Sequence, residues 1–371
     1  MNWWRKLKKN PLARAGALLL LIFYLAVICA DFVAPYDPYV SQPNASLLPP
    51  TQIYWRNQAE EFIGPHVYPT EQGSTDLETG KRELIVDWQS PSPLALFVPG
   101  PSYQLFQISL PLPPNFREVE IFPGFEFDRH LFGTTGEAKF NLLGTDEQAR
   151  DQFSRLVHGG RISLSIGLVG IAISFPLGML VGGISGYFGG WIDAVSMRLV
   201  EVLMTIPSIY LLVSLAAVLP PGLSSAQRFL LIVLITSFVS WSGLARVIRG
   251  RMLSLKEREF VEAARAIGAN PFYIIARQIL PQTATYAIIA ATLAVPGFIL
   301  AEATLSLIGL GIQQPDPSWG NMLSLATDAS IVVLQPWLVW PPALLIVLTV
   351  LAFNLLGDGL RDALDPRSTQ R

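Results

Sequence analysis

The stretch EFVEAARAIGANPFYIIARQILP, residues 259–281, carries two apolar stripes at helical spacing. Gly268 is a natural C-terminal stop for a first helix, and Asn270 followed by Pro271 is a natural start for a second. The sequence therefore predicts two short helices joined by a sharp turn. The two stripes are Phe260, Ala263, Ala264 and Ile267, and then Phe272, Ile275, Ala276 and Ile279. Such stripes need a cover, and the pattern leaves open whether a partner protein or the chain's own helices and the membrane surface provide it.

The composition around this stretch is that of a membrane protein. The chain has 371 residues, of which 51% are hydrophobic and 15% charged, whereas an average soluble domain has about 25% charged residues. This excludes a disordered chain and argues against an ordinary soluble enzyme. The net charge of -2 also argues against a nucleic-acid partner. One cysteine, Cys29, excludes an intramolecular disulfide framework, and three scattered histidines do not indicate a metal centre.

Six segments have the length and apolarity of membrane-spanning helices, since a bilayer core of about 30 Å takes about 20 apolar residues. The six segments are 15–34, 162–192, 202–227, 229–245, 278–301 and 329–357. In the third segment, 202–227, Pro220 is expected to end the helix early, and in the sixth, 329–357, the helix is expected to begin after Pro336. The first could be a cleaved signal peptide, but its apolar stretch is longer than usual, which favours an uncleaved anchor. We therefore predict an all-α integral membrane protein with six transmembrane helices.

Basic residues predict which side of the membrane each loop faces, because cytoplasmic loops carry an excess of Lys and Arg. Residues 1–14 hold five basic and no acidic side chains, and residues 246–277 hold seven basic and three acidic ones. Residues 35–157 hold 8 basic and 16 acidic side chains. We therefore expect cytoplasmic N- and C-termini and an extracytoplasmic segment 36–157.

The chain divides into three parts by composition. Residues 1–35 form the N-terminus and the first helix, and residues 141–371 hold the other five. Between them, residues 36–140 begin with a Pro-rich stretch and continue as short aromatic and β-branched runs separated by Pro and Gly. That pattern is typical of strands and turns, so we predict a β-rich insertion, with an irregular loop as the alternative. Residues 139–158 are predicted to be helical.

The second segment contains Gly178, Gly182 and Gly186, each four residues apart and therefore on one helix face. Such a row allows a second helix to approach closely, although glycine is also generally common in membrane helices.

Pro176, Pro207 and Pro296 lie inside apolar segments and are expected to kink them. Two acidic residues, Glu201 and Glu302, lie near the ends of segments. No chain of ionisable groups crosses the membrane, which argues against a proton-coupled carrier.

The 259–281 stretch resembles the EAA loop of ATP-binding-cassette importer permeases, in Glu262-Ala263-Ala264, Gly268 and Ile279-Leu280-Pro281. Further matches point to the dipeptide/oligopeptide/nickel permease family, and among its members to the C-type subunit. The matching segments are LGTDEQARDQFSR (143–155), GYFGG (186–190), AEATLSLIGLG (301–311), PSWG (317–320) and NLLGDGLRDALDP (354–366). The resemblance covers about residues 1–35 and 141–368. Ala149 stands where the family usually has Gly, so the turn before Arg150 is expected to differ.

The resemblance implies a bacterial inner-membrane permease with the type I fold of ABC importers. Its partners would be a B-type permease subunit, two cytoplasmic ABC ATPases, an extracytoplasmic solute-binding protein and membrane lipid. The loop at about 250–281 would couple the chain to an ATPase through Glu262, Ala263, Ala264, Gly268, Ala269, Asn270, Pro271, Ile279, Leu280 and Pro281. ATP and Mg²⁺ would be held by the ATPases, because this chain has no GxxxxGK[ST] phosphate loop and is not itself an enzyme.

The implied substrate is a di- or oligopeptide, with nickel or another small solute as the alternative. An ATPase-independent secondary carrier is the rival class, but such a carrier would need coupling-ion sites at the membrane midplane. A membrane-embedded enzyme would need a reactive group deep in the bilayer, and all three histidines lie outside the apolar segments.

Overall fold

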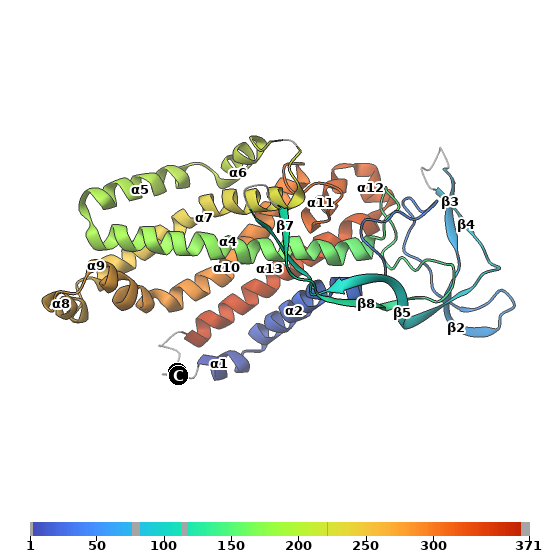
Figure 1. Cartoon of the computed structure of the whole chain (residues 1–371), viewed down its shortest axis with the longest axis horizontal. Helices are drawn as coiled ribbons and strands as arrows, with labels where there is room; N and C mark the ends of the chain where they lie inside the picture. The colour runs from blue at the N-terminus through green and yellow to red at the C-terminus, as the bar shows by residue number, and fades with distance from the viewer. Residues whose placement is uncertain (1–2, 76–81, 113–116, 221, 365–371) are drawn as a thin grey trace.

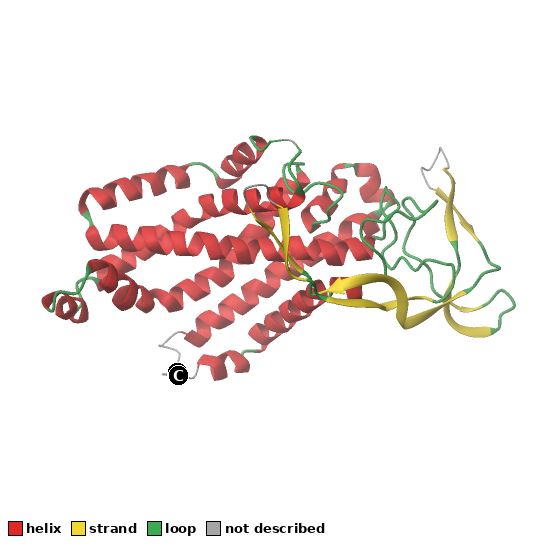
Figure 2. Ribbon diagram, in the orientation of Figure 1, coloured by secondary structure: helices red, strands yellow, loops and turns green. Residues whose placement is uncertain are grey.

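The computed structural model describes residues 3–75, 82–112, 117–220 and 222–364. Long helices lie side by side in a bundle, and most of the strands extend beyond one end of it (Figure 1). Figure 2 shows the same division, with helices forming the larger part and strands confined to a smaller one. The last two residues of the C-terminal matching segment, 365 and 366, lie outside the described residues.

The helices alternate between long apolar ones and short connecting ones. They are α1 (Trp3–Lys9), α2 (Pro11–Ile28), α3 (Ala30–Val33), α4 (Gln152–Phe188), α5 (Gly190–Thr205), α6 (Ser208–Ala217), α7 (Ser225–Leu255), α8 (Glu259–Ala266), α9 (Pro271–Tyr273), α10 (Ala284–Leu307), α11 (Trp319–Leu323), α12 (Ala329–Leu334) and α13 (Pro336–Leu364). A π-helical turn, Ile274–Ile279, and a 3-10 turn, Leu280–Thr283, connect α9 to α10. In the core of the bundle α4 lies against α7 and α10, and α2 lies against α13.

Five helical segments within the described residues are long and apolar enough to cross a membrane, or six if α5 and α6 together form one bent span. The third predicted segment, 202–227, differs most from the structure. The apolar pair runs from Gly190 to Ala217 and bends by 88° between its two helices. Pro207 causes the break, because proline lacks an N–H and disfavours helical geometry in the residue before it. Ile206 is accordingly extended. Pro176 and Pro296 lie inside uninterrupted helices.

The prediction of a helix over residues 139–158 is wrong for residues 139–151. Residues 139–151 form turns, and α4 begins only at Gln152. Asp151 caps that helix, since its Oδ2 accepts a hydrogen bond from the Ser154 N–H at 2.7 Å. Burial of this carboxyl raises its pKa to about 7, although the hydrogen bonds from Ser154 act in the opposite direction. The helix start is therefore set by a buried cap rather than by apolar spacing.

The strands form one four-stranded sheet, ordered β1-β2-β5-β8, and two separate antiparallel pairs, β3-β4 and β6-β7. Every pairing is antiparallel. The strands are β1 (Tyr54–Arg56), β2 (Phe62–Val67), β3 (Thr70–Thr75), β4 (Arg82–Val86), β5 (Ser92–Leu105), β6 (Ile108–Leu112), β7 (Arg117–Phe122) and β8 (Phe125–Thr134). They all lie between α3 and α4, in the part of the chain whose composition differs from the rest.

The three spaced glycines of α4 lie against α7. A Cβ on Gly178 would come within 2.9 Å of the Trp241 carbonyl oxygen, and a Cβ on Gly186 within 2.8 Å of the Arg249 oxygen. A Cβ on Gly182 would collide with the carbonyl oxygen of Ala245. Because the contacted carbonyls are also four residues apart, the two backbones run together over two helical turns.

We expect Gly182→Ala to lower the thermal midpoint of the purified protein, because the added methyl group has no room and overpacking costs about 1–3 kcal/mol. Gly243→Ala is the matched control, because a Cβ there meets nothing within 4 Å. That variant should equal or exceed wild-type stability, since alanine favours helix over glycine. Equal midpoints for both variants would show that the glycine row does not set the helix distance.

Candidate functional site

The 259–281 stretch forms a helix, a tight turn and a second helix at the end of the bundle away from most of the strands (Figure 1). Gly268 has φ +76°, a backbone conformation that favours glycine after a helix. The Asn270 side chain then accepts a hydrogen bond from the Phe272 N–H at 2.9 Å, and Pro271 is the first residue of α9. The second helix is not a separate short one, because it continues through the π and 3-10 turns into α10.

Both apolar stripes of this stretch are split between an inner and an outer side. Val261, which belongs to neither predicted stripe, is fully buried, and Ala264 is 7% exposed. These two residues share a small core whose other members are Met252, Ile274, Ile275 and Ile279. The structure therefore answers half of the question that the sequence leaves open: the inner half packs on the chain itself.

The outer half of the stripes, and Tyr273 beside it, stay exposed in the part of the chain that the structure describes. Ile267 is 85% exposed, Phe272 61%, Tyr273 52% and Phe260 38%. We call these four residues the apolar tip. An exposed group of large apolar side chains at one end of a molecule is typical of a protein–protein contact surface.

Aromatic contacts connect this stretch to the end of α4. The Arg265 Nε donates a hydrogen bond to the Tyr187 hydroxyl at 3.2 Å, and its guanidinium lies 5.0 Å from the centre of that ring. The rings of Phe188 and Phe272 are 5.9 Å apart. These contacts join the stretch to the end of α4, and the chain itself continues from α9 into α10.

The residues predicted to contact an ATPase differ in exposure. Among the described residues no ion pair to Glu262 is formed, and its side chain is exposed. The exposed members are Glu262, Ala263, Gly268, Asn270, Pro271 and Pro281, the half-buried ones Ala269 and Leu280, and the buried ones Ala264 and Ile279. Ala264 and Ile279 thus hold the turn together and do not lie on its surface.

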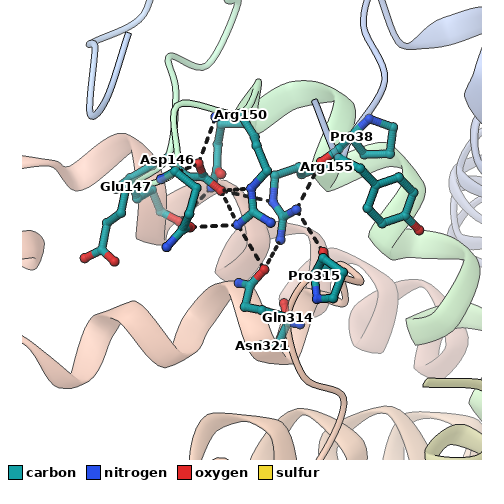
Figure 3. Close-up of polar contacts among 12 residues, drawn as sticks. Pro38, Asp146, Glu147, Arg150, Arg155, Gln314, Pro315 and Asn321 are labelled. Atoms are coloured by element: carbon teal, nitrogen blue, oxygen red, sulfur yellow. Dashed lines mark hydrogen bonds and ion pairs between the residues drawn. The ribbon is translucent and has the colours of Figure 1, made fainter. Parts of the chain in front are cut away.

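A second group of polar residues, which the sequence alone does not bring together, lies near the strands and is drawn in Figure 3. Asp146 accepts hydrogen bonds from the Arg150 backbone N–H at 2.9 Å and from its Nε at 2.8 Å. The Arg155 Nε lies 3.3 Å from Asp146 Oδ2. The side chains of Asp146 and Arg150 are both 5% exposed and that of Arg155 is 1% exposed. We call these three residues the buried ion cluster.

The buried ion cluster joins segments that are distant in the chain. Arg155 Nη1 donates to the carbonyl oxygens of Pro38 and Pro315, each at 3.1 Å. Both arginines also donate to the Gln314 Oε1, at 2.8 and 2.9 Å. Ala149, next to this cluster, has φ +61° and so adopts the backbone that the expected glycine would favour.

Glu302 lies inside the bundle rather than at its edge and is fully buried. Its carboxylate accepts hydrogen bonds from the hydroxyls of Ser306 at 2.6 Å, Ser318 at 2.8 Å and Ser163 at 3.4 Å. Ser163 in turn accepts from the Trp319 N–H at 3.0 Å. These bonds attach α11 to α4 and α10.

Comparison with known proteins gives a consistent result. Residues 175–370 match the sequence model of the binding-protein-dependent transport system inner membrane component, and residues 2–50 match the N-terminal TM domain of oligopeptide transport permease C. The dipeptide transport system permease protein DppC of Bacillus subtilis is 31% identical over 366 residues, which cover 98% of this chain and 84% of that protein. The oligopeptide transport system permease protein OppC of Haemophilus influenzae is 42% identical over 228 residues, 62% of this chain and 71% of that protein.

A third relative is the glutathione transport system permease protein GsiD of Pectobacterium atrosepticum, 39% identical over 243 residues, 66% of this chain and 77% of that protein. Among solved structures, the MetNI methionine ABC transporter in an inward-facing conformation has a chain with a TM-score of 0.43 and 20% identity, covering 57% of this chain and 97% of that one. The first family match alone spans more than half of the sequence, and the Bacillus relative aligns with nearly all of it. The chain therefore belongs to the family of inner membrane components of binding-protein-dependent transport systems.

Proposed function

We propose that this chain is the C-type permease subunit of an ATP-driven importer for di- or oligopeptides. The support comes from relatives named for dipeptide, oligopeptide and glutathione transport. Nickel or another small solute is the alternative cargo within the same class of importer. An ATPase-independent secondary carrier is the alternative outside it.

The apolar tip is the observation that carries the proposal. We infer that Ile267, Phe272 and Tyr273 insert into a groove of a cytoplasmic ABC ATPase, with Glu262 available to pair with a basic residue there. Closure of the ATPase pair on ATP would push α8. The push would reach α10 along the chain and α4 through Arg265 and Tyr187, and so bias the bundle between outward- and inward-facing states.

The assembly that we propose has a B-type permease subunit, two ATPases and an extracytoplasmic solute-binding protein. ATP and Mg²⁺ would be bound by the ATPases. In a bacterial inner membrane the chain would cross six times, with α5 and α6 forming one bent span. Its two termini and α8 would be cytoplasmic, and residues 36–157 would lie outside.

Purification of the assembly tests the function directly. We expect a second permease and two ATPases to copurify with this chain, and the binding protein to carry peptides that mass spectrometry identifies. Reconstituted vesicles should then take up those peptides only when ATP is present on the side of the membrane that carries the ATPases. Uptake that proceeds without any ATPase would contradict the importer and favour a secondary carrier, whereas bound nickel would change only the cargo.

The orientation is tested by cysteine labelling. In a Cys29→Ser background, Ser74→Cys should react with a membrane-impermeant maleimide from the outside only, because Ser74 is exposed on β3. Ile267→Cys, at the apolar tip, should react from the cytoplasmic side only, in membranes without the ATPases, because the proposed groove would otherwise cover it. Labelling of Ser74→Cys from the cytoplasmic side alone would contradict the proposed topology.

A further inference from the structure

The strands β5, β6, β7 and β8 form one long hairpin with a bend. Its base is the pair of β5 and β8, and beyond the bend the chain continues as the pair of β6 and β7. In Figure 1 β7 runs across the direction of the long helices rather than along it. The second half of the hairpin therefore lies roughly in the plane that a bilayer surface would have.

The bend lies at the same level as the outer end of α2. Gln104, Phe106 and Gln107 line one cavity, of about 750 Å³, together with Tyr24 and Ile28 of α2 and nearby residues of α4. An 18-residue helix is about 27 Å long, close to the thickness of the hydrocarbon core of a bilayer. Since α2 runs from Pro11 to Ile28, its last turn reaches the outer boundary of that core, and the bend of the hairpin must be close to the same boundary.

The hairpin carries apolar side chains that stay about half exposed among the residues that the structure describes. Phe125 and Ile121 are each 59% exposed, and Phe106 and Phe127 each 46%. On β8 Phe125 and Phe127 alternate with Glu126 and Asp128, so the start of the strand has an apolar face and a charged one. The helix α2 also exposes leucine and isoleucine residues, between 49% and 58%, of which Ile28 shares the cavity with Phe106: Leu18, Leu21, Ile22, Leu25 and Ile28.

The backbone at the bend fixes this exposure. Gly124 has φ +79°, and a Cβ there would come within 2.6 Å of the Leu105 carbonyl oxygen. Phe106 also has a positive φ, +63°, which is unusual for an aromatic residue. The chain thus adopts an unfavourable backbone while leaving a phenylalanine ring half exposed.

The base of the hairpin is attached to the segment that follows α2, so its height above the helices is defined. The His130 Nδ1 lies 2.7 Å from the Ala34 carbonyl oxygen, and the rings of Phe32 and Phe97 are 6.1 Å apart. On the α4 side, Arg161 donates to the Val27 carbonyl oxygen at 3.1 Å and to Asp31 at 2.6 Å.

We propose that the bend and its flanking strands, residues 104–107 and 121–127, lie in the outer headgroup region of the membrane and contact lipid. Aromatic side chains favour that region because it accepts both apolar and polar groups. Glu126 and Asp128 limit the depth, since carboxylates remain in the hydrated headgroup zone. The insertion between α3 and α4 thereby acts as a second membrane contact. This inference rests on the proposed crossing of the bilayer by α2, and on neither the cargo nor the ATPases.

Site-directed spin labelling tests the proposal on the assembled transporter in phosphatidylethanolamine/phosphatidylglycerol vesicles. In the Cys29→Ser background, nitroxide labels are placed at Phe125→Cys and Phe106→Cys. Leu21→Cys is the control for lipid and Ser74→Cys the control for water. Collision with oxygen, which concentrates in lipid, is compared with collision with a water-soluble nickel chelate. The measured quantity is the collision rate with oxygen divided by the collision rate with the nickel chelate. At Phe125 and Phe106 this ratio should be severalfold above that at Ser74 and approach that at Leu21.

Each other outcome overturns the proposal in a distinct way. A ratio equal to that at Ser74 would place the bend in water. Low collision with both reagents would show that another protein, such as the second permease, covers the apolar face. A water-like result at Leu21 itself would refute the crossing by α2, and with it both the proposed topology and the lipid contact. A lipid-like result at Leu21 with an aqueous Phe125 would leave the proposed function intact.

Discussion

The Gly268→Asp variant will reach the membrane in normal amounts but lose ATP-dependent uptake by about tenfold or more. Gly268 lies beside Ile267 and close in sequence to Phe272, in the apolar tip that we propose docks into an ATPase. A carboxylate buried without a partner at that contact costs several kcal/mol, and each 1.4 kcal/mol weakens binding about tenfold. Uptake by reconstituted vesicles and ATP hydrolysis by the same vesicles are the two measurements, and we expect hydrolysis to persist without transport.

The fold should tolerate this change. A Cβ on Gly268 meets nothing within 4 Å, and aspartate is among the residues that adopt a positive φ most readily. Gly268→Asn is the matched control, because it has the same size and the same backbone preference without the charge. It should keep most of the uptake. Wild-type uptake by the aspartate variant would refute the docking assignment, and equal losses in both variants would assign the effect to the backbone instead of the charge.

Local signals in the sequence explain why the turn of this site could be predicted. Gly268, Asn270 and Pro271 each specify their own backbone geometry within a few residues, and the structure has the turn that they specify. The inner face of α8 could not be predicted in the same way. Val261 is buried because Ile274 and Met252 pack on it, and which neighbours a helix meets is not contained in its own spacing.

Long-range contacts are the part that the sequence does not reveal. The prediction of a helix over residues 139–158 fails because Asp146 bonds Arg150 and holds a turn with Ala149 at positive φ. The same aspartate meets Arg155, whose other partners are Pro38 and Gln314, more than 100 residues away in either direction. Only the folded bundle brings these segments together, so the matching segment 143–155 is recognisable in sequence while its role as a junction is not.

Replacing Asp146 with Ala should have the largest effect on stability of any substitution at the strand end of the bundle. It leaves the guanidinium groups of Arg150 and Arg155, which are 5% and 1% exposed, without their carboxylate. Removing one partner of a buried ion pair costs about 3–5 kcal/mol, because the remaining charge stays buried and unpaired. We expect a clearly lower thermal midpoint of the purified protein and a smaller amount of it in the membrane, since the links to Pro38 and Gln314 depend on the same arginines.

The control is an aspartate of the same region that pairs at the surface. Asp128 lies 3.9 Å from Arg129, and the two side chains are 68% and 59% exposed. Surface pairs contribute about 0–1 kcal/mol, so Asp128→Ala should leave the midpoint almost unchanged. The double variant Asp146→Ala/Arg150→Met removes one of the two arginine charges that lost their carboxylate. It should recover part of the lost stability. If Asp146→Ala were as stable as Asp128→Ala, the buried ion cluster would not be what holds residue 38, residues 146–155 and residues 314–315 together.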